Sequence, residues 1–120
     1  MMTTVAYSLA VVLDLFILFI GGRFLLQPSA AAAGYGVPSE RSAYLAVKGV
    51  RDAALGVLGL ALLAFAGATP AAWFMLAAAI IPLGDTVIVL RFGGTRTTAF
   101  GVHFATAIVV LISAALLFAA

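Results

Sequence analysis

The sequence predicts an all-α integral membrane protein: one domain over residues 1–120, built as an up-down bundle of four transmembrane helices. The first observation is composition, because 66% of the 120 residues are hydrophobic and only 8% are charged, against about a quarter charged in a typical soluble domain. The second is that four apolar stretches each approach the roughly 20 residues needed to cross a hydrocarbon core. Even spacing and short links between these stretches favour an up-down arrangement.

The first two spans are predicted at about residues 4–26 and 41–67. The first is apolar apart from Asp14 near its middle, whereas the second begins with a charged turn and has its apolar body after it. The link between them, residues 27–47, is the longest and contains Pro28. We expect a short interfacial or re-entrant piece in this link.

The last two spans are predicted at about residues 71–91 and 98–119. Pro82 lies inside the third span and cannot donate a hydrogen bond to the carbonyl of Ala78, so the helix should bend there. A short Gly-Ala-Thr-Pro turn, residues 67–70, carries the helix stop and start signals that join the second span to the third.

The basic residues predict the orientation. If the four spans are right, all six lie on one side of the membrane, and the other side carries both termini, the turn at residues 67–70 and no basic side chain; the six are Arg23, Arg41, Lys48, Arg51, Arg91 and Arg96. The positive-inside rule then places the basic loops in the cytoplasm and both termini outside a multi-pass cell-membrane protein. Trp73 is expected at the outer interface. The first span lacks a basic n-region, so we expect it to be retained and not cleaved as a signal peptide.

Composition also limits the chemistry. The chain has no cysteine, which excludes disulfides, thiol catalysis and cysteine-based metal sites. One histidine and four carboxylates could build only a sparse metal site, so we expect no metal and no organic cofactor. The net charge of +2 suits lipid headgroups of the bilayer better than nucleic acid, because the basic residues gather at the span ends.

Polar residues from all four spans are predicted to meet at one depth. A rise of about 1.5 Å per residue puts Asp14, Asp85 and His103 each about 9–13 Å from the basic end of its span, and Arg51 and Asp52 enter just before the second apolar body. Charged groups in hydrocarbon cost at least about 2.5 kcal/mol each on insertion scales and usually mark function. Such a layer in the cytoplasmic half of the bundle therefore indicates a site.

Helical periodicity predicts which faces point inward. Tyr7, Asp14 and Gly21 share one stripe of the first span, and Thr106 follows His103 on the fourth. In the second span, small residues surround Asp52, so this carboxylate should face protein; the face is Gly49, Asp52, Gly56 and Gly59. Arg51 points about 100° away from Asp52, and either reaches into the site or extends to the headgroups. We take Tyr7, Lys48 and Thr106 as candidate substrate-binding residues.

The stretch Lys48-Gly49-Val50-Arg51-Asp52 followed by Gly56 resembles the most recognisable segment of a family of small four-helix membrane proteins, known as a domain of unknown function in bacteria and fungi. The later Asp85, the segment Leu90-Arg91-Phe92-Gly93 and His103 fit the same pattern. The resemblance covers most of the chain. It implies the four-helix architecture and a polar site at Arg51, Asp52, Asp85 and His103, and it implies no particular reaction.

The leading functional hypothesis is a cofactor-independent acid–base enzyme, an isomerase, cyclase or epoxide hydrolase acting on a lipophilic small molecule. A set of carboxylates, one imidazole and a guanidinium can keep one acid charged and another protonated. Asp85 or Asp52 would serve as base, His103 as its proton-sharing partner, Arg51 as an electrostatic anchor and Asp14 as a second acid.

Two other functional classes remain open. A proton-coupled small-molecule transporter would require Asp14 alone and an obligatory dimer, and the sequence leaves a homodimer open. A non-catalytic assembly protein would use the same residues structurally: Arg51 and Asp52 in an interhelical ion pair, and His103 on a carbonyl freed by Pro82.

Overall fold

The computed structural model describes residues 1–38 and 43–120, and within these residues the chain is helical with no strand. The helices in chain order are α1 (Met2–Leu26), α2 (Pro28–Tyr35), α3 (Ala43–Phe65), α4 (Ala68–Ala78), α5 (Ile80–Arg91), α6 (Arg96–Thr98), the π-helix η1 (Ala99–Phe104) and α7 (Ala105–Ala119). The all-α prediction is confirmed. The predicted start of the second span near residue 41, and Arg41 itself, lie outside the described residues.

In the part of the chain that the structure describes, three helices are long and apolar enough to cross a membrane: Met2–Leu26, Ala68–Arg91 and Arg96–Ala119. The chain therefore has the character of a membrane protein. Helix α3 has 23 residues, and its N-terminal half carries the charged residues Lys48, Arg51 and Asp52.

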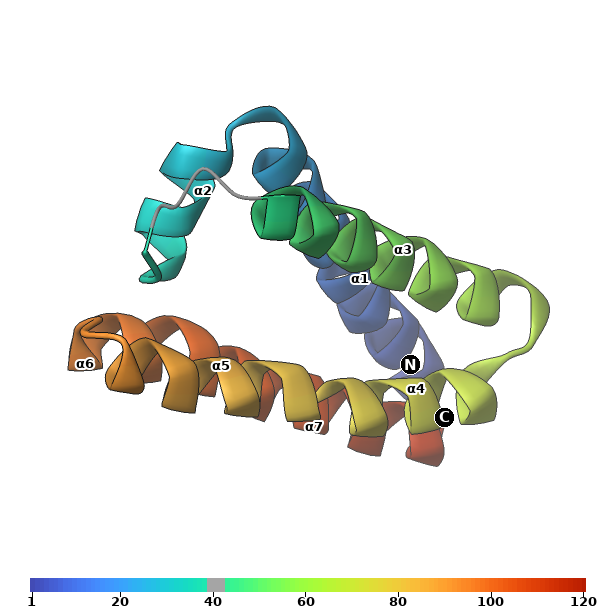
Figure 1. The fold of residues 1–120 in the computed structure, drawn as a ribbon. Coiled ribbons are helices and arrows are strands. Elements are labelled where there is room, and N and C mark those ends of the chain that lie inside the picture. The colour runs from blue at the N-terminus through green and yellow to red at the C-terminus, as the bar shows by residue number, and fades with distance from the viewer. Residues whose placement is uncertain (39–42) are drawn as a thin grey trace.

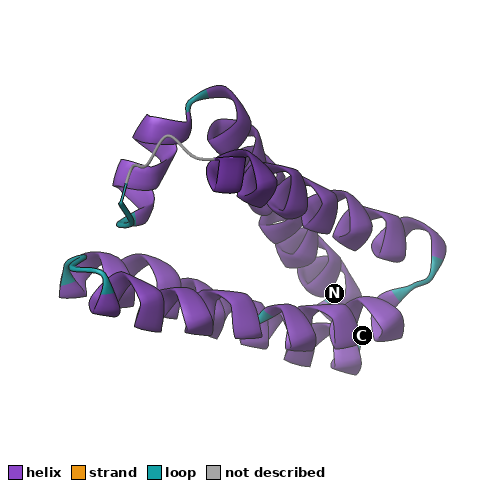
Figure 2. Ribbon diagram, viewed as in Figure 1, coloured by secondary structure: helices purple, strands orange, loops and turns teal. Residues whose placement is uncertain are grey.

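The helices form two layers that meet at one end (Figure 1). Helices α1 and α3 lie side by side in one layer, and the continuous path α4–α5 packs against the path from α6 to α7 in the other. Both chain termini and the α3–α4 link lie at one end of the molecule, whereas α2 and α6 lie at the other. Within residues 1–38 and 43–120, the loops between the helices are short (Figure 2).

Glycine and proline set the ends of the short helix α2. Pro28 occupies its first turn, where a missing N–H is tolerated. Gly36 ends it in the left-handed conformation with φ of 86°, which favours glycine. The link between the first two predicted spans, where a short interfacial or re-entrant piece is expected, therefore contains a short helix.

The third predicted span is interrupted at Ala79, between α4 and α5. Pro82 lies three residues further on, is buried, and offers no N–H to the carbonyl of Ala78. The helix is thus interrupted three residues before the proline at which the sequence predicts a bend.

The α1–α3 contact depends on small residues. The predicted glycine face of α3 is buried; its members are Gly49, Asp52, Gly56 and Gly59. A methyl group added at Gly21 of α1 would meet the backbone of Gly49 and Ala53. The two backbones therefore approach as closely as small-residue interfaces between membrane helices allow.

The fourth predicted span is not a uniform α-helix. It begins at α6, where the Thr95 hydroxyl accepts from the backbone N–H of Thr98 at 3.1 Å. It then widens into η1 before continuing as α7. Such π-helical segments are rare and are frequent at functional sites, and the apolar periodicity of residues 98–119 did not predict this one.

Candidate functional site

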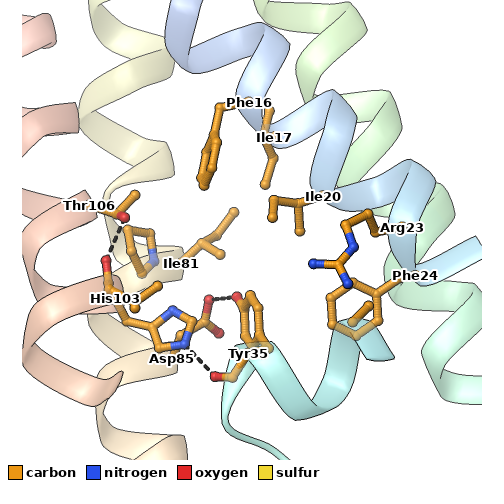
Figure 3. A pocket seen from close by; sticks show the side chains of 14 residues that line it. Phe16, Ile17, Ile20, Arg23, Phe24, Tyr35, Ile81, Asp85, His103 and Thr106 are labelled. Carbon is orange, nitrogen blue, oxygen red and sulfur yellow. Dashed lines mark hydrogen bonds between the residues drawn. The ribbon is translucent and has the colours of Figure 1, made fainter. Parts of the chain in front are cut away.

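A cavity of about 160 Å³ lies between α1, α2, α5, η1 and the start of α7 (Figure 3). Most of its wall is apolar, and polar side chains gather at one end. Its lining residues are Phe16, Ile17, Ile20, Arg23, Phe24, Ala31, Gly34, Tyr35, Ile81, Pro82, Asp85, Val102, His103 and Thr106. An engineered apolar cavity of about 150 Å³ binds benzene, so this cavity has room for a ring-sized or short branched group.

Tyr35, the last residue of α2, connects the polar side chains. Its hydroxyl donates a hydrogen bond to Oδ2 of Asp85 on α5. Its backbone carbonyl lies 2.7 Å from Nε2 of His103 on η1, and the Tyr35 and His103 rings are 4.2 Å apart between centroids. We call Tyr35, Asp85 and His103 the acid–base cluster.

The hydrogen bonds define the proton positions in this cluster. A carbonyl oxygen only accepts, so Nε2 of His103 carries the proton, and in a neutral ring Nδ1 keeps its lone pair. Burial and the neighbouring Asp85 carboxylate raise the pKa of the Tyr35 phenol above its usual value. Tyr35 therefore remains a hydroxyl donor over the physiological pH range, while Asp85 accepts from it.

Two glycines hold α2 over the cavity. A side chain at Gly36 would overlap Thr98 and Val89, and a side chain at Gly94 would overlap Val89 and the Gly36 carbonyl. The C-terminus of α2 can therefore lie directly against the α5–α6 connection, which fixes Tyr35 beside Asp85 and His103.

Lys48 and Asp52 flank the cluster. Lys48 Nζ lies 2.7 Å from Oδ2 of Asp52 and above the rings of Tyr35 and Phe24, at 4.2 and 4.9 Å from their centroids. Neither residue lines the cavity. The ammonium group therefore compensates the buried Asp52 carboxylate and supports the face of the Tyr35 ring.

Asp14 lies in a second, smaller cavity of about 90 Å³ that it lines together with residues of α3, α4, α5 and α7. Its side chain is 2% exposed. The carboxyl occupies the space that a side chain at Gly59 would need, so α3 covers it within the same subunit.

Thr106 lines both cavities, and its hydroxyl donates to the carbonyl of Val102 at 2.6 Å. Two other candidates lie elsewhere. Arg51 is exposed and lines neither cavity, because its direction on α3 differs from that of the buried Asp52. Tyr7 packs against the apolar core near the chain termini, about 10 Å along α1 from Asp14 by the helical rise.

The structure thus brings together Asp85, His103 and Thr106 of the predicted residues, places Lys48 with Asp52 beside them, and puts Asp14 in the adjoining cavity. Sequence reasoning missed Tyr35 and Arg23, both of which line the first cavity. A tyrosine followed by glycine in the otherwise alanine-rich link was the available signal for Tyr35.

Among the described residues, no three side chains of the His, Asp and Glu types lie close enough together to hold a metal ion. The polar groups at hand are suited to hydrogen bonding and proton transfer.

A family model, "Domain of unknown function (DUF4267)", matches residues 15–117. The chain belongs to this family. The resemblance drawn from the Gly-x-Arg-Asp segment and the later aspartate and histidine is therefore correct at the level of the family. No curated protein and no solved structure matches the chain.

Proposed function

We propose that this DUF4267 protein is a membrane enzyme that carries out acid–base chemistry on a lipophilic small molecule, as an isomerase, cyclase or epoxide hydrolase. The observation that carries the proposal is the acid–base cluster at the polar end of an otherwise apolar cavity. Ligand sites commonly combine an apolar lining with a few convergent polar groups.

The cluster contains a proton acceptor and a proton donor side by side. The Nδ1 lone pair of His103 removes a proton from one carbon of the substrate, and the imidazolium, after exchange with solvent, returns a proton at another carbon, so the ring ends as it began. The Tyr35 hydroxyl turns from Asp85 to donate a hydrogen bond to the substrate oxygen that gains electron density, and it keeps its proton. A proton-transfer isomerisation removes one proton and returns one, so these groups suffice for its balance. Positioned acid–base groups typically contribute about 10²–10⁴-fold to a rate.

An apolar groove offers the substrate a route from the bilayer. The groove runs along α1, η1 and α7, and three of its lining residues also line the cavity: Phe16, Val102 and Thr106. Phe16 and Val102 are 45% and 42% exposed. A lipophilic molecule would therefore reach the cluster sideways, without crossing the aqueous phase.

The proposal includes the four-span topology. Helix α3 has 23 residues and would extend about 34 Å at 1.5 Å per residue, enough to cross beside α1. Its charged residues lie in its N-terminal half, at the basic end of the molecule. The positive-inside rule then puts α2 and α6 on the cytoplasmic side and both termini outside.

The test uses full-length protein in lipid nanodiscs and a panel of C10–C20 unsaturated ketones, polyenes and epoxides, incubated in D₂O or H₂¹⁸O. We expect protein-dependent incorporation of deuterium or ¹⁸O into at least one panel member, reduced at least about 100-fold by Tyr35→Phe and by His103→Gln. Tyr44→Phe is the matched control, because Tyr44 is 80% exposed.

Incorporation that is unchanged in Tyr35→Phe, or a panel that stays unlabelled, would overturn the proposal. Proton flux across vesicles on addition of a lipophilic cation, lost in Asp14→Asn, would instead identify a transporter. If the wild type labels no panel compound and the Tyr35→Phe and His103→Gln variants fail to fold, the non-catalytic assembly role remains.

A further inference from the structure

The second cavity contains a buried carboxyl group without a partner in the protein. Oδ2 of Asp14 makes no hydrogen bond with any described residue, although the side chain is 2% exposed. The other polar side chain described in the cavity wall is Thr106, whose hydroxyl already donates to Val102. The rest of the wall is apolar and includes Phe16, Ile17 and Met75.

A buried carboxyl group without a hydrogen-bond partner lowers the stability of the fold. A buried polar atom without a partner costs about 1–3 kcal/mol, and an apolar residue of similar size would avoid this cost. The fold nevertheless leaves room for the carboxyl, because Gly59 of α3 has no side chain to overlap it. Helix α3 therefore accommodates the Asp14 carboxyl by having a glycine at the point of contact. A carboxyl that is kept at this cost indicates that it binds a ligand.

The two cavities share one wall. Phe16, Ile17, Ile81, Pro82 and Thr106 line both of them, and four of these side chains are labelled beside the acid–base cluster in Figure 3. The two cavities are therefore neighbours, and a molecule that extends from the cluster to Asp14 would have to pass these shared residues.

We infer that the second cavity is a subsite for a hydroxyl group on the lipophilic molecule, bound by Asp14. The inference rests on the proposed function for what the other end of the molecule does. A hydroxyl both donates and accepts, so it pairs with a carboxyl group in either protonation state, whereas an ether or ketone only accepts. An ammonium group would bring a second charge into an apolar cavity, where the desolvation penalty is large. Asp14 is on this basis a substrate-binding residue and not a second acid.

Methionine labelling makes the subsite directly observable. The chain has three methionines; Met75 lines the second cavity and is 3% exposed, while Met1 and Met2 are 99% and 51% exposed. Full-length protein with ¹³C-methyl methionine, in detergent micelles, is titrated with 1-hexanol, with its isomer methyl pentyl ether and with hexylammonium. The Met1 and Met2 signals report non-specific partitioning of each probe.

We expect the Met75 signal to shift with saturation, and 1-hexanol to bind about five- to tenfold more tightly than the ether, which corresponds to one net hydrogen bond. The preference should disappear in Asp14→Leu and persist in Asp52→Asn, whose carboxyl is buried outside this cavity. Equal affinity of the wild type for the two isomers, or tighter binding of hexylammonium, overturns the inference.

The wild-type comparison alone decides the matter if Asp14→Leu fails to fold. The titration needs no turnover, so its failure is distinguishable from failure of the proposed function. Isotope incorporation without a hexanol preference would retain the enzyme and remove the subsite, and the reverse result would retain the subsite alone.

Discussion

Replacing Lys48 by methionine should strongly destabilise the protein, whereas the same change at Arg51 should not. Both residues are cations in α3, three positions apart, but among the described residues the ion-pair partner belongs to Lys48: its ammonium is 2.7 Å from Asp52, whose side chain is 6% exposed. Arg51 is exposed. The two variants therefore test which face of α3 packs against the rest of the protein.

The magnitude follows from burial. Removing one member of a fully buried ion pair costs about 3–5 kcal/mol, because the other charge is left uncompensated. The Lys48 side chain is 25% exposed, and methionine keeps its packing against the Phe24 and Tyr35 rings, so we expect about 2–3 kcal/mol. This is about a 30- to 150-fold increase in the unfolding equilibrium constant. Arg51→Met should change stability by no more than about 0.5 kcal/mol.

Reversible unfolding in mixed detergent micelles, followed by circular dichroism, measures both variants. The double variant Lys48→Met with Asp52→Asn should recover part of the loss, because no uncompensated carboxylate remains. If Arg51→Met proved as destabilising as Lys48→Met, or if Asp52→Asn gave no recovery, the assigned orientation of α3 would be refuted.

Three further outcomes are expected. Gly22→Ala should increase the free energy of unfolding by up to about 1 kcal/mol through helix propensity, because a methyl group there meets nothing within 4 Å. Gly21→Ala should decrease it, since overpacking costs about 1–3 kcal/mol and the added methyl group would meet the backbone of α3. In an alkaline titration followed by tyrosinate absorbance, wild type and Tyr35→Phe should ionise the same number of tyrosines up to about pH 11, because the pKa of Tyr35 is raised above its usual value of about 10. The phenol of Tyr35 loses its proton at a lower pH in the unfolded chain than in the folded protein. The stability that Tyr35 contributes is therefore fully present below about pH 10 and is lost as the pH rises above it. Above that pH, the free energy of unfolding should fall more steeply for the wild type than for Tyr35→Phe. A side chain at Gly94, as in Gly94→Val, should displace α2 and reduce any isotope incorporation, while Gly93→Ala tests only the positive φ of 86° and should leave the cluster in place.

Composition and periodicity predicted the features that repeat along a helix. Burial of Asp14, Asp52 and His103 followed from their neighbours at helical spacing, and all three are buried. The break near Pro82 followed from a missing N–H. These features are local, so a single sequence contains the information that determines them.

The missing parts of the site depend on contacts between distant segments. Tyr35 lies 50 and 68 positions from Asp85 and His103, and the eight-residue α2 is too short and too uniformly small to show which side faces inward. Nothing in the apolar run of residues 99–104 distinguishes a π-helix from an α-helix. The sequence left open whether Arg51 reaches into the site or extends to the headgroups. Neighbouring residues on a helix differ in direction by about 100°, and which of these directions faces the cavity depends on how α3 packs.

The sequence analysis placed the polar groups by their distance from the basic end of each predicted span, and this predicted a single polar layer. In the structure the helices cross, and the polar groups divide between two cavities. Asp85 lies with a phenol and an imidazole, and Asp14 lies beyond Phe16 and Ile17 in an apolar cavity. This separation bears on the transport alternative. An exporter that binds its cargo between two subunits needs the carboxylate of helix one on an open face, but here α3 of the same subunit covers Asp14 through Gly56 and Gly59. To expose that carboxylate to a partner, α1 and α3 would have to separate along their most closely packed contact, so the arrangement favours a ligand held within one subunit.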